Sequence, residues 1–466
     1  MLATPEKPAT GAGSFDWPLA YDAEAFLRRQ IDAFLAHNTA ARQLAGRMET
    51  ETGTDFYEWV DHFTLDPSTE TELAALGLRE EAVPAPKDWR ILYHPRAMMP
   101  RVVLVDGGTR DGAPKTLAIR AESIVDFASR HNLGPERDGC LGASMRQLVV
   151  SDEGGFVFRA LERLAYRGFM IEEPTFEFVS DVVRVRELWR MRRRDFPDDA
   201  DAVAHAFALQ AKVIGLVGRD VACELFFAEE RAYWELRNTA ARIQKRRQDL
   251  LGLGWGNHDH HTFRSSRRFF ADFIRFLLNF GFEKRERYYA GAEAGWGAQI
   301  SEHPVTGITV FADVDLTPDE TEIDFSTQPL PPAPRLGTVG LWCGLHGDSF
   351  LQAGMHHLEA RFDFAALRDQ LEQHGVKTMR PFSDFPFLKQ AFTEGERWAV
   401  SLPRVEKLRR QGLITAEQEV SFIENGAIGS HLENLERKGG YKGFNQKSVS
   451  VIIAATDPRA MQHSHA

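Results

Sequence analysis

An approximate internal repeat in the second half of the chain limits the fold more than any other feature. Residues 260–282 and 356–376 each begin with a pair of histidines in a short stretch of strand character, followed by an amphipathic helix. A serine or aspartate precedes each helix, and Gly281 or Gly375 closes it as a left-handed cap. We therefore expect the same structural unit twice.

Three strands are predicted after each helix. The first copy has them at residues 285–289, 296–300 and 308–314, and the second at 421–423, 429–435 and 448–453. A Pro-rich loop, residues 327–336, separates the copies. The result is a pair of βαβββ units, which usually join their sheets into a half-open barrel. The predicted fold class is α+β.

The first half shows no repeat and no catalytic motif. It predicts one strand at residues 101–106, with a turn at Gly107 and Gly108, and four helices at residues 23–45, 156–166, 201–217 and 229–251. The expected organisation is a disordered tail (1–14), a mixed but mainly helical N-terminal region (15–253), a metal-binding paired βαβββ domain (254–460) and a second tail (461–466).

Composition excludes several classes of protein. The net charge is −11 without a basic block, which argues against a nucleic-acid partner. The three cysteines, Cys140, Cys223 and Cys343, are far apart and form no CxxC motif, so neither a disulfide framework nor a zinc ribbon is expected. Without an apolar signal core or a run of 18 apolar residues, the sequence predicts a cytoplasmic protein that does not span a membrane.

The histidine strands carry the candidate ligands. Alternate residues share a face of a strand, so His260 lies on the same face as Arg264, and His357 on the same face as Arg361. The strand at 429–435 presents Glu433. Two imidazoles and one carboxylate that leave one side open suit non-haem Fe(II), although the same set also describes zinc hydrolase sites.

Other histidines near these positions are expected to support the ligands or to pack. They are His261, His356 and His431. Glu436 is a rival to Glu433 as the third ligand, but it lies on the opposite face of its strand and beside Arg437. Glu433 is therefore preferred.

These motifs resemble the vicinal oxygen chelate superfamily, and within it the 2-oxoadipate dioxygenase/decarboxylase (hydroxyglutarate synthase) family. The likeness rests on a His-x-x-x-Arg motif at His260 and again at His357, and on the motif GSHLE-x-x-x-R at residues 429–437. It extends over roughly residues 254–457.

The resemblance implies a ligand set and a reaction. His260, His357 and Glu433 would hold Fe(II), and Arg264 would bind the substrate carboxylate, joined by Arg361. The family consumes a 2-oxo acid and O₂ and releases CO₂ and a hydroxy acid. For 2-oxoadipate the product is 2-hydroxyglutarate, an intermediate of lysine degradation.

Two alternatives stay open. The chain could be another vicinal oxygen chelate metalloenzyme, an extradiol ring-cleaving or arylpyruvate dioxygenase, which the 33 phenylalanines mildly favour. It could also be a metal-free ligand-binding module on the same scaffold. The resemblance is compatible with a monomer or a homodimer.

Overall fold

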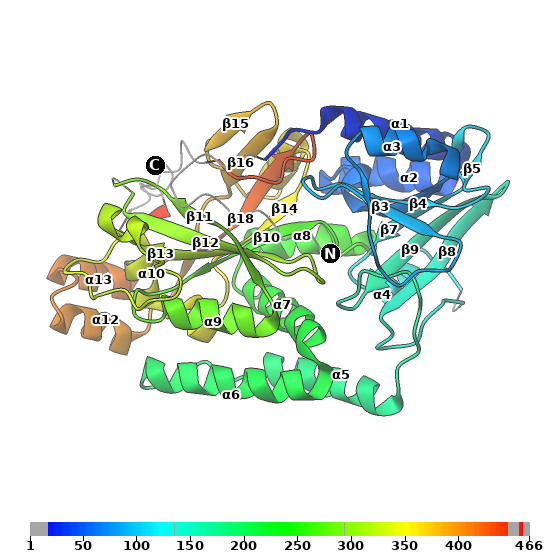
Figure 1. Cartoon of the computed structure of the whole chain (residues 1–466). Helices are drawn as coiled ribbons and strands as arrows, with labels where there is room; N and C mark the ends of the chain where they lie inside the picture. Colours follow the sequence, from blue (N-terminus) through cyan, green and yellow to red (C-terminus); the bar gives the residue numbers. More distant parts are fainter. Residues whose placement is uncertain (1–16, 135, 293, 446–455, 460–466) are drawn as a thin grey trace.

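The computed structural model describes residues 17–134, 136–292, 294–445 and 456–459. Both predicted tails, 1–14 and 461–466, and the predicted strand 448–453 lie outside the described residues. Figure 1 shows two β-sheets at opposite ends of the molecule, one from each half of the chain.

The C-terminal sheet has the strand order β11-β12-β13-β10-β14-β18-β16-β15, and β17 pairs with β18. Its strands are β10 (His258–Arg264), β11 (Glu283–Tyr289), β12 (Trp296–Glu302), β13 (Thr309–Asp315), β14 (His357–Arg361), β15 (Ser383–Phe385), β16 (Leu388–Phe392), β17 (Glu396–Trp398) and β18 (Ala427–Arg437). The associated helices are α9 (Phe270–Phe280), α10 (Thr338–His346), α11 (Phe364–Glu372), α12 (Leu402–Arg410) and α13 (Ala416–Asn425).

This topology confirms the two βαβββ units. In the first unit β10 runs parallel to β13, in the second β14 runs parallel to β18, and the antiparallel pair β10–β14 joins the units. Gly281 caps α9 in the left-handed conformation, and the Asp363 side chain caps α11, as predicted.

One predicted strand of the second unit is wrong. Residues 421–423 lie in α13, whose start is fixed by a capping box between Thr415 and Gln418. The strands that follow α11 are instead β15 and β16, and α12 and α13 are inserted before β18. The short apolar run at 421–423 belongs to a helix face.

The N-terminal sheet repeats the same topology. Its order is β2-β3-β4-β1-β7-β9-β8, with β1 parallel to β4, β7 parallel to β9, and an antiparallel β1–β7 pair at the centre. An isolated bridge between Asp138 and Gln147 stands where the eighth strand would be. The elements are β1 (Val60–Leu65), α3 (Glu70–Ala75), β2 (Arg79–Glu80), β3 (Arg90–Tyr93), β4 (Arg101–Leu104), β7 (Thr116–Arg120), α4 (Ile124–Arg130), β8 (Met145–Glu153) and β9 (Phe156–Arg163). The chain therefore contains two paired βαβββ sheets.

More residues of the described N-terminal region lie in helices than in strands, as predicted, but three predicted helices differ. Residues 156–163 form strand β9, which buries Phe156, Phe158 and Ala160 with the two-residue period of a strand. Residues 229–251 contain two helices, because the Asn238 side chain caps the second one. Asn38 likewise divides residues 23–45 into two helices.

The remaining elements connect or cover the sheets. They are α1 (Tyr21–His37), α2 (Thr39–Arg47), β5 (Thr109–Arg110), β6 (Ala113–Pro114), α5 (Phe176–Arg190), α6 (Asp199–Val217), α7 (Arg219–Glu235), α8 (Thr239–Leu250), and short 3₁₀- or π-helices at Met48–Thr52, Phe56–Trp59, Pro67–Thr69, Pro318–Glu322 and Ser349–Ala353.

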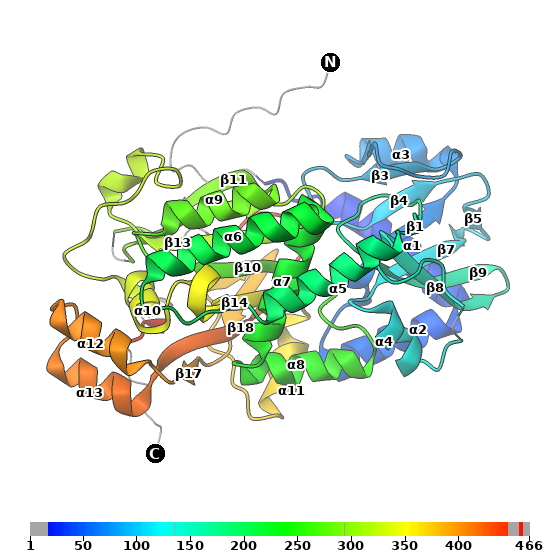
Figure 2. The same ribbon diagram turned by 90° about the horizontal axis from the view of Figure 1, so that it is seen from below.

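Helices α5, α6 and α7 cover the C-terminal half. They share one hydrophobic core with α9 and the strands of that sheet, and Figure 2 shows them lying across it. Among the described residues, α6 alone is long and apolar enough to cross a membrane by length and composition. Its buried residues, among them Ala206 and Val213, pack in this core.

Candidate metal centre

Four ionisable side chains meet at the centre of the C-terminal sheet. Ligand atoms of His260, Glu359 and Glu433 all lie within 4.8 Å of one another. His357 Nε2 lies 2.5 Å from Glu359 Oε1 and 3.6 Å from Glu433 Oε2. All four side chains are buried. The three predicted ligands are therefore brought together, and Glu359 joins them.

Strand register explains the convergence. Glu359 of β14 is paired with His260 of β10 on one side and with Glu433 of β18 on the other, so these residues form one row across three strands. His357 lies two residues along β14 from Glu359 and shares its face. Glu359 was not predicted from the sequence, although strand alternation puts it on the same face as His357, and this signal could have marked it as a further candidate ligand.

The charges in the cluster depend on each other. Burial alone would raise the pKa of Glu359, but His260 and His357 lower it to about 2. Burial and the neighbouring Glu359 raise the pKa of Glu433 well above its usual value. Burial opposes ionisation of His260, yet Glu359 and Asp259 raise its pKa to about 9. Without a cation, a proton on Glu433 and a proton on His260 therefore offset the negative charge of the two adjacent buried carboxyl groups.

This donor set fits a divalent metal ion. A cation that replaced the shared protons would compensate both carboxylates, and two imidazoles with carboxylate oxygens suit first-row transition metals. Within the described residues, Glu359 Oε2 is buried without a hydrogen-bond partner, which leaves a donor atom free for such an ion. The candidate ligands lie on strands β10, β14 and β18, which favours a fixed geometry.

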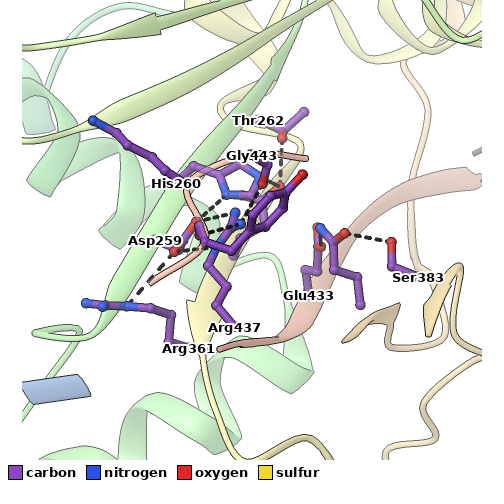
Figure 3. Close-up of polar contacts among 12 residues, drawn as sticks. Asp259, His260, Thr262, Arg361, Ser383, Glu433, Arg437 and Gly443 are labelled. Carbon is purple, nitrogen blue, oxygen red and sulfur yellow. Dashed lines mark hydrogen bonds and ion pairs between the residues drawn. The ribbon is translucent and has the colours of Figure 1, made fainter. Parts of the chain in front are cut away.

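Asp259 orients His260. Its Oδ1 lies 2.8 Å from His260 Nδ1, and Arg437 donates to both carboxylate oxygens at 3.1 Å. Figure 3 shows Asp259 between the His260 ring and the guanidinium groups of Arg361 and Arg437. This contact leaves Nε2 of His260 directed at the cluster, 3.1 Å from Glu359 Oε1.

The N-terminal sheet contains a matching arrangement without the metal cluster. Asp61 Oδ1 lies 2.7 Å from His62 Nδ1, and Arg163 donates to both oxygens of Asp61 at 2.8 Å. On the neighbouring strand, however, Ala118 occupies the position opposite His62. The Asp-His pair is therefore present twice, but the carboxylates that could bind metal are present once among the described residues.

Replacing Asp259 with asparagine is expected to weaken metal binding by about 10- to 100-fold, because His260 loses the group that orients it. Competition with a chelator during Fe(II) or Mn(II) titration measures the affinity. Asp61→Asn is the matched control, since it breaks the same kind of buried pair in the other sheet. Equal metal affinities for the two variants would show that Asp259 has no role in ligation.

A small cavity of about 80 Å³ adjoins the cluster. Residues from seven strands of the C-terminal sheet line it, so the sheet wraps around it. Its apolar walls are Phe311, Val339, Phe382, Phe392 and Phe444. The side chains of a half-open barrel thus enclose a site next to the four candidate ligands.

Arg264 also lines this cavity. It is buried, its guanidinium carbon lies 5.6 Å from the Trp342 ring centroid, and its Nε and Nη1 have no hydrogen-bond partner among the described residues. Asp313 is paired with it in the β10–β13 register. Burial raises the pKa of Asp313 to about 8 despite the opposing effect of Arg264. Arg264 is thus a buried cation with N–H groups free for a ligand.

Arg361 does not line this cavity. Its Nη1 donates to Glu58 Oε2 at 2.6 Å, on the side that faces the N-terminal sheet. Glu436 is also elsewhere, since its carboxylate accepts from the backbone of Phe364 and pairs with Lys438. Glu433 is therefore the residue of the two that reaches the cluster.

The remaining histidines of these strands, His261, His356 and His431, lie close to the candidate ligands in the sequence. His356 Nδ1 lies 2.6 Å from His357 Nδ1, His431 stacks on Phe392, and His261 lies against Phe227. Each is buried, and none belongs to the cavity lining. This placement agrees with the supporting role predicted for them.

Comparisons with known proteins add a fold-level likeness. No protein-family model and no curated protein matches the chain. Among solved structures, a triple mutant of 4-hydroxymandelate synthase from Streptomyces coelicolor aligns at 12% identity and a TM-score of 0.28, covering 86% of this chain and 98% of that one. Methylmalonyl-CoA epimerase from Mycobacterium tuberculosis aligns at 12% identity and a TM-score of 0.23, covering 39% of this chain and 88% of that one. Such scores carry no argument about activity, and the fold assignment rests on the strand order.

Proposed function

We propose that the protein is a non-haem Fe(II)-dependent dioxygenase/decarboxylase of the vicinal oxygen chelate type that acts on a 2-oxo acid. The observation that supports this most is one small cavity that is lined both by the candidate metal-binding cluster and by the buried cation Arg264. A 2-oxo acid offers a chelating carboxylate and ketone to a metal and, when it is a dicarboxylate, a second carboxylate to an arginine.

The bound metal would supply the site at which the 2-oxo acid and O₂ react. The residues of the chain have separate tasks. His260, His357 and Glu433 would hold the ion, with Glu359 as a further donor or as an acceptor for a substrate proton. Arg264 would pair with the substrate carboxylate, and the phenylalanine walls would exclude water.

For 2-oxoadipate the overall reaction consumes one O₂ and gives 2-hydroxyglutarate and one CO₂. The small cavity favours a short acid over a large aromatic compound. The phenylalanine walls support the alternative, an arylpyruvate or ring-cleaving dioxygenase. A metal-free binding module is disfavoured, because two buried carboxylates beside two imidazoles are costly without a cation.

Oxygen uptake tests the proposal. Protein loaded anaerobically with Fe(II) is mixed with 2-oxoadipate, shorter 2-oxo acids, phenylpyruvate and catechol, and O₂ and CO₂ are followed together. The expected result is uptake with a short 2-oxo acid and one CO₂ per O₂. Uptake with catechol and no CO₂ would favour ring cleavage, and no uptake by iron-loaded protein would contradict the oxygenase proposal.

A further inference from the structure

A second cavity lies between the two sheets, outside the candidate metal centre. Its volume is about 550 Å³, within the usual range of small-molecule sites. Asp61 and Arg163 line it from the N-terminal sheet, and Asp259 and Arg437 line it from the C-terminal sheet. The two Asp–Arg pairs of the duplicated sheets therefore face a common space. Phe444 belongs to the walls of both this cavity and the metal-adjacent one, so it separates them.

Positive charge is in excess on these walls. Eight arginine or lysine residues and six aspartate or glutamate residues line the cavity, although the whole chain carries a net charge of −11. Burial also raises the pKa of one of the acids, Glu58, to about 7, so that part of its charge is lost near neutral pH. A space with such walls attracts anions.

Comparison of equivalent positions in the two sheets shows that Arg120 lacks the carboxylate partner that its counterpart Arg361 has. Arg120 ends β7 and Arg361 ends β14, and these are equivalent central strands of the two sheets. Arg361 pairs with Glu58, which precedes Asp61 by three residues. The residue three positions before Asp259 is Gly256, so the equivalent carboxylate is missing for Arg120.

Close packing keeps a side chain out of that position. A Cβ atom on Gly256 would lie 2.6 Å from the Trp59 ring and 2.7 Å from the carbonyl oxygen of Arg120. No hydrogen bond or ion pair satisfies the Arg120 guanidinium within the described part of the chain. A half-buried arginine on a cavity wall without a counter-ion is suited to bind one from solution.

We propose that the cavity between the sheets binds a small molecule that carries an oxyanion, a carboxylate or a phosphate, and that Arg120 is its main counter-charge. The proposed site is separate from the substrate cavity and does not depend on the reaction. It is connected to the metal centre, because Arg437 and Arg361, which line it, also contact the Asp259 carboxylate that orients His260. One acid on the wall, Glu224, has a carboxylate oxygen without a partner among the described residues. A ligand that also carries an ammonium group would satisfy Glu224.

Thermal melting and calorimetric titration of the full-length protein test this proposal. The probes are inorganic phosphate, succinate and aspartate, each compared with sodium chloride at the same ionic strength. At least one probe is expected to raise Tm saturably and to bind with a measurable Kd. Tighter binding of phosphate or of succinate identifies the oxyanion, and tighter binding of aspartate than of succinate identifies Glu224 as a second contact.

Variants locate the binding site. Arg120→Gln is expected to raise Kd by about tenfold or more, the cost of one charge-assisted hydrogen bond. Arg120→Lys keeps the positive charge and should raise Kd by a smaller factor. If Arg120→Gln shows no cooperative melting transition, Arg120→Lys is used in its place. Arg137→Gln removes an exposed arginine and should bind like the unmodified protein. The proposal is overturned if no probe differs from chloride, if Arg120→Gln binds normally, or if Arg264→Gln alone abolishes binding, since the metal-adjacent cavity would then be the site.

Discussion

His260→Ala and His357→Ala are each expected to lose bound metal and all oxygen uptake. Each histidine places its Nε2 within 3.1 Å of Glu359 Oε1, at the point where the candidate ligands converge. Removal of the orienting partner of a ligand already costs about 10- to 100-fold in metal affinity, so removal of the ligand itself should cost at least about 100-fold. Metal content after anaerobic Fe(II) loading and desalting measures the effect directly and does not depend on knowledge of the substrate.

His374→Ala is the matched control, because His374 is exposed at the end of α11 and should leave metal content unchanged. The same loading experiment on Glu433→Gln and Glu359→Gln tests the carboxylates. If Glu433 is the third ligand and Glu359 a neighbouring base, Glu433→Gln loses metal and Glu359→Gln keeps it. If both histidine variants retain metal as well as the control does, the assignment of the metal centre is wrong.

Of the two paired βαβββ sheets, only the C-terminal one could be predicted, because only there is the repeat visible in the sequence. The two histidine strands, their helices and Gly281 recur with similar spacing, so the C-terminal units were found. Two strands of the N-terminal sheet are too short to show a period, since β2 has two residues and β3 has four. Strand β9 has eight residues, but the sequence predicts a helix there because Val157, Leu161 and Leu164 also recur at helical spacing.

A second signal for the duplication was present in the sequence. Residues 161–169 read LERLAYRGF, and residues 435–444 read LERKGGYKGF. In the structure Arg163 and Arg437 each pair with the aspartate of an Asp-His pair and donate to a carbonyl oxygen of the following loop. The segments therefore mark the same structural position in both halves, and their comparison would have revealed the N-terminal sheet.

Strand parity predicted that His260, His357 and Glu433 share a site, but it could not place both arginines. The strands β10 and β14 are antiparallel, so a step of four residues from His260 and from His357 leads in opposite directions. Arg264 therefore lines the metal-adjacent cavity, whereas Arg361 lines the cavity between the sheets. Sequence spacing is identical for both, and only the pairing direction distinguishes them.

Arg264→Met is expected to separate binding from stability. Loss of a buried charged partner of a substrate carboxylate costs about 2–5 kcal/mol, so KM for the 2-oxo acid should rise by about 30-fold or more. The ligand-free variant should melt at the same temperature or higher, because Arg264 Nε and Nη1 have no partner among the described residues. Asp313 does not become an uncompensated charge, since its pKa is already about 8 and the loss of Arg264 raises it further.

Arg267→Met is the matched control, because we expect it to change stability and not substrate binding. Arg267 is also buried, but Glu320 accepts hydrogen bonds from its guanidinium, so its removal leaves a carboxylate unpaired. We expect Arg267→Met to lower Tm and to leave KM unchanged. Steady-state oxygen uptake and melting curves of both variants give the comparison. If Arg264→Met lowers Tm and leaves KM unchanged, Arg264 stabilises the fold and the substrate carboxylate binds elsewhere. Ligand binding would then not explain why this buried arginine has unpaired N–H groups.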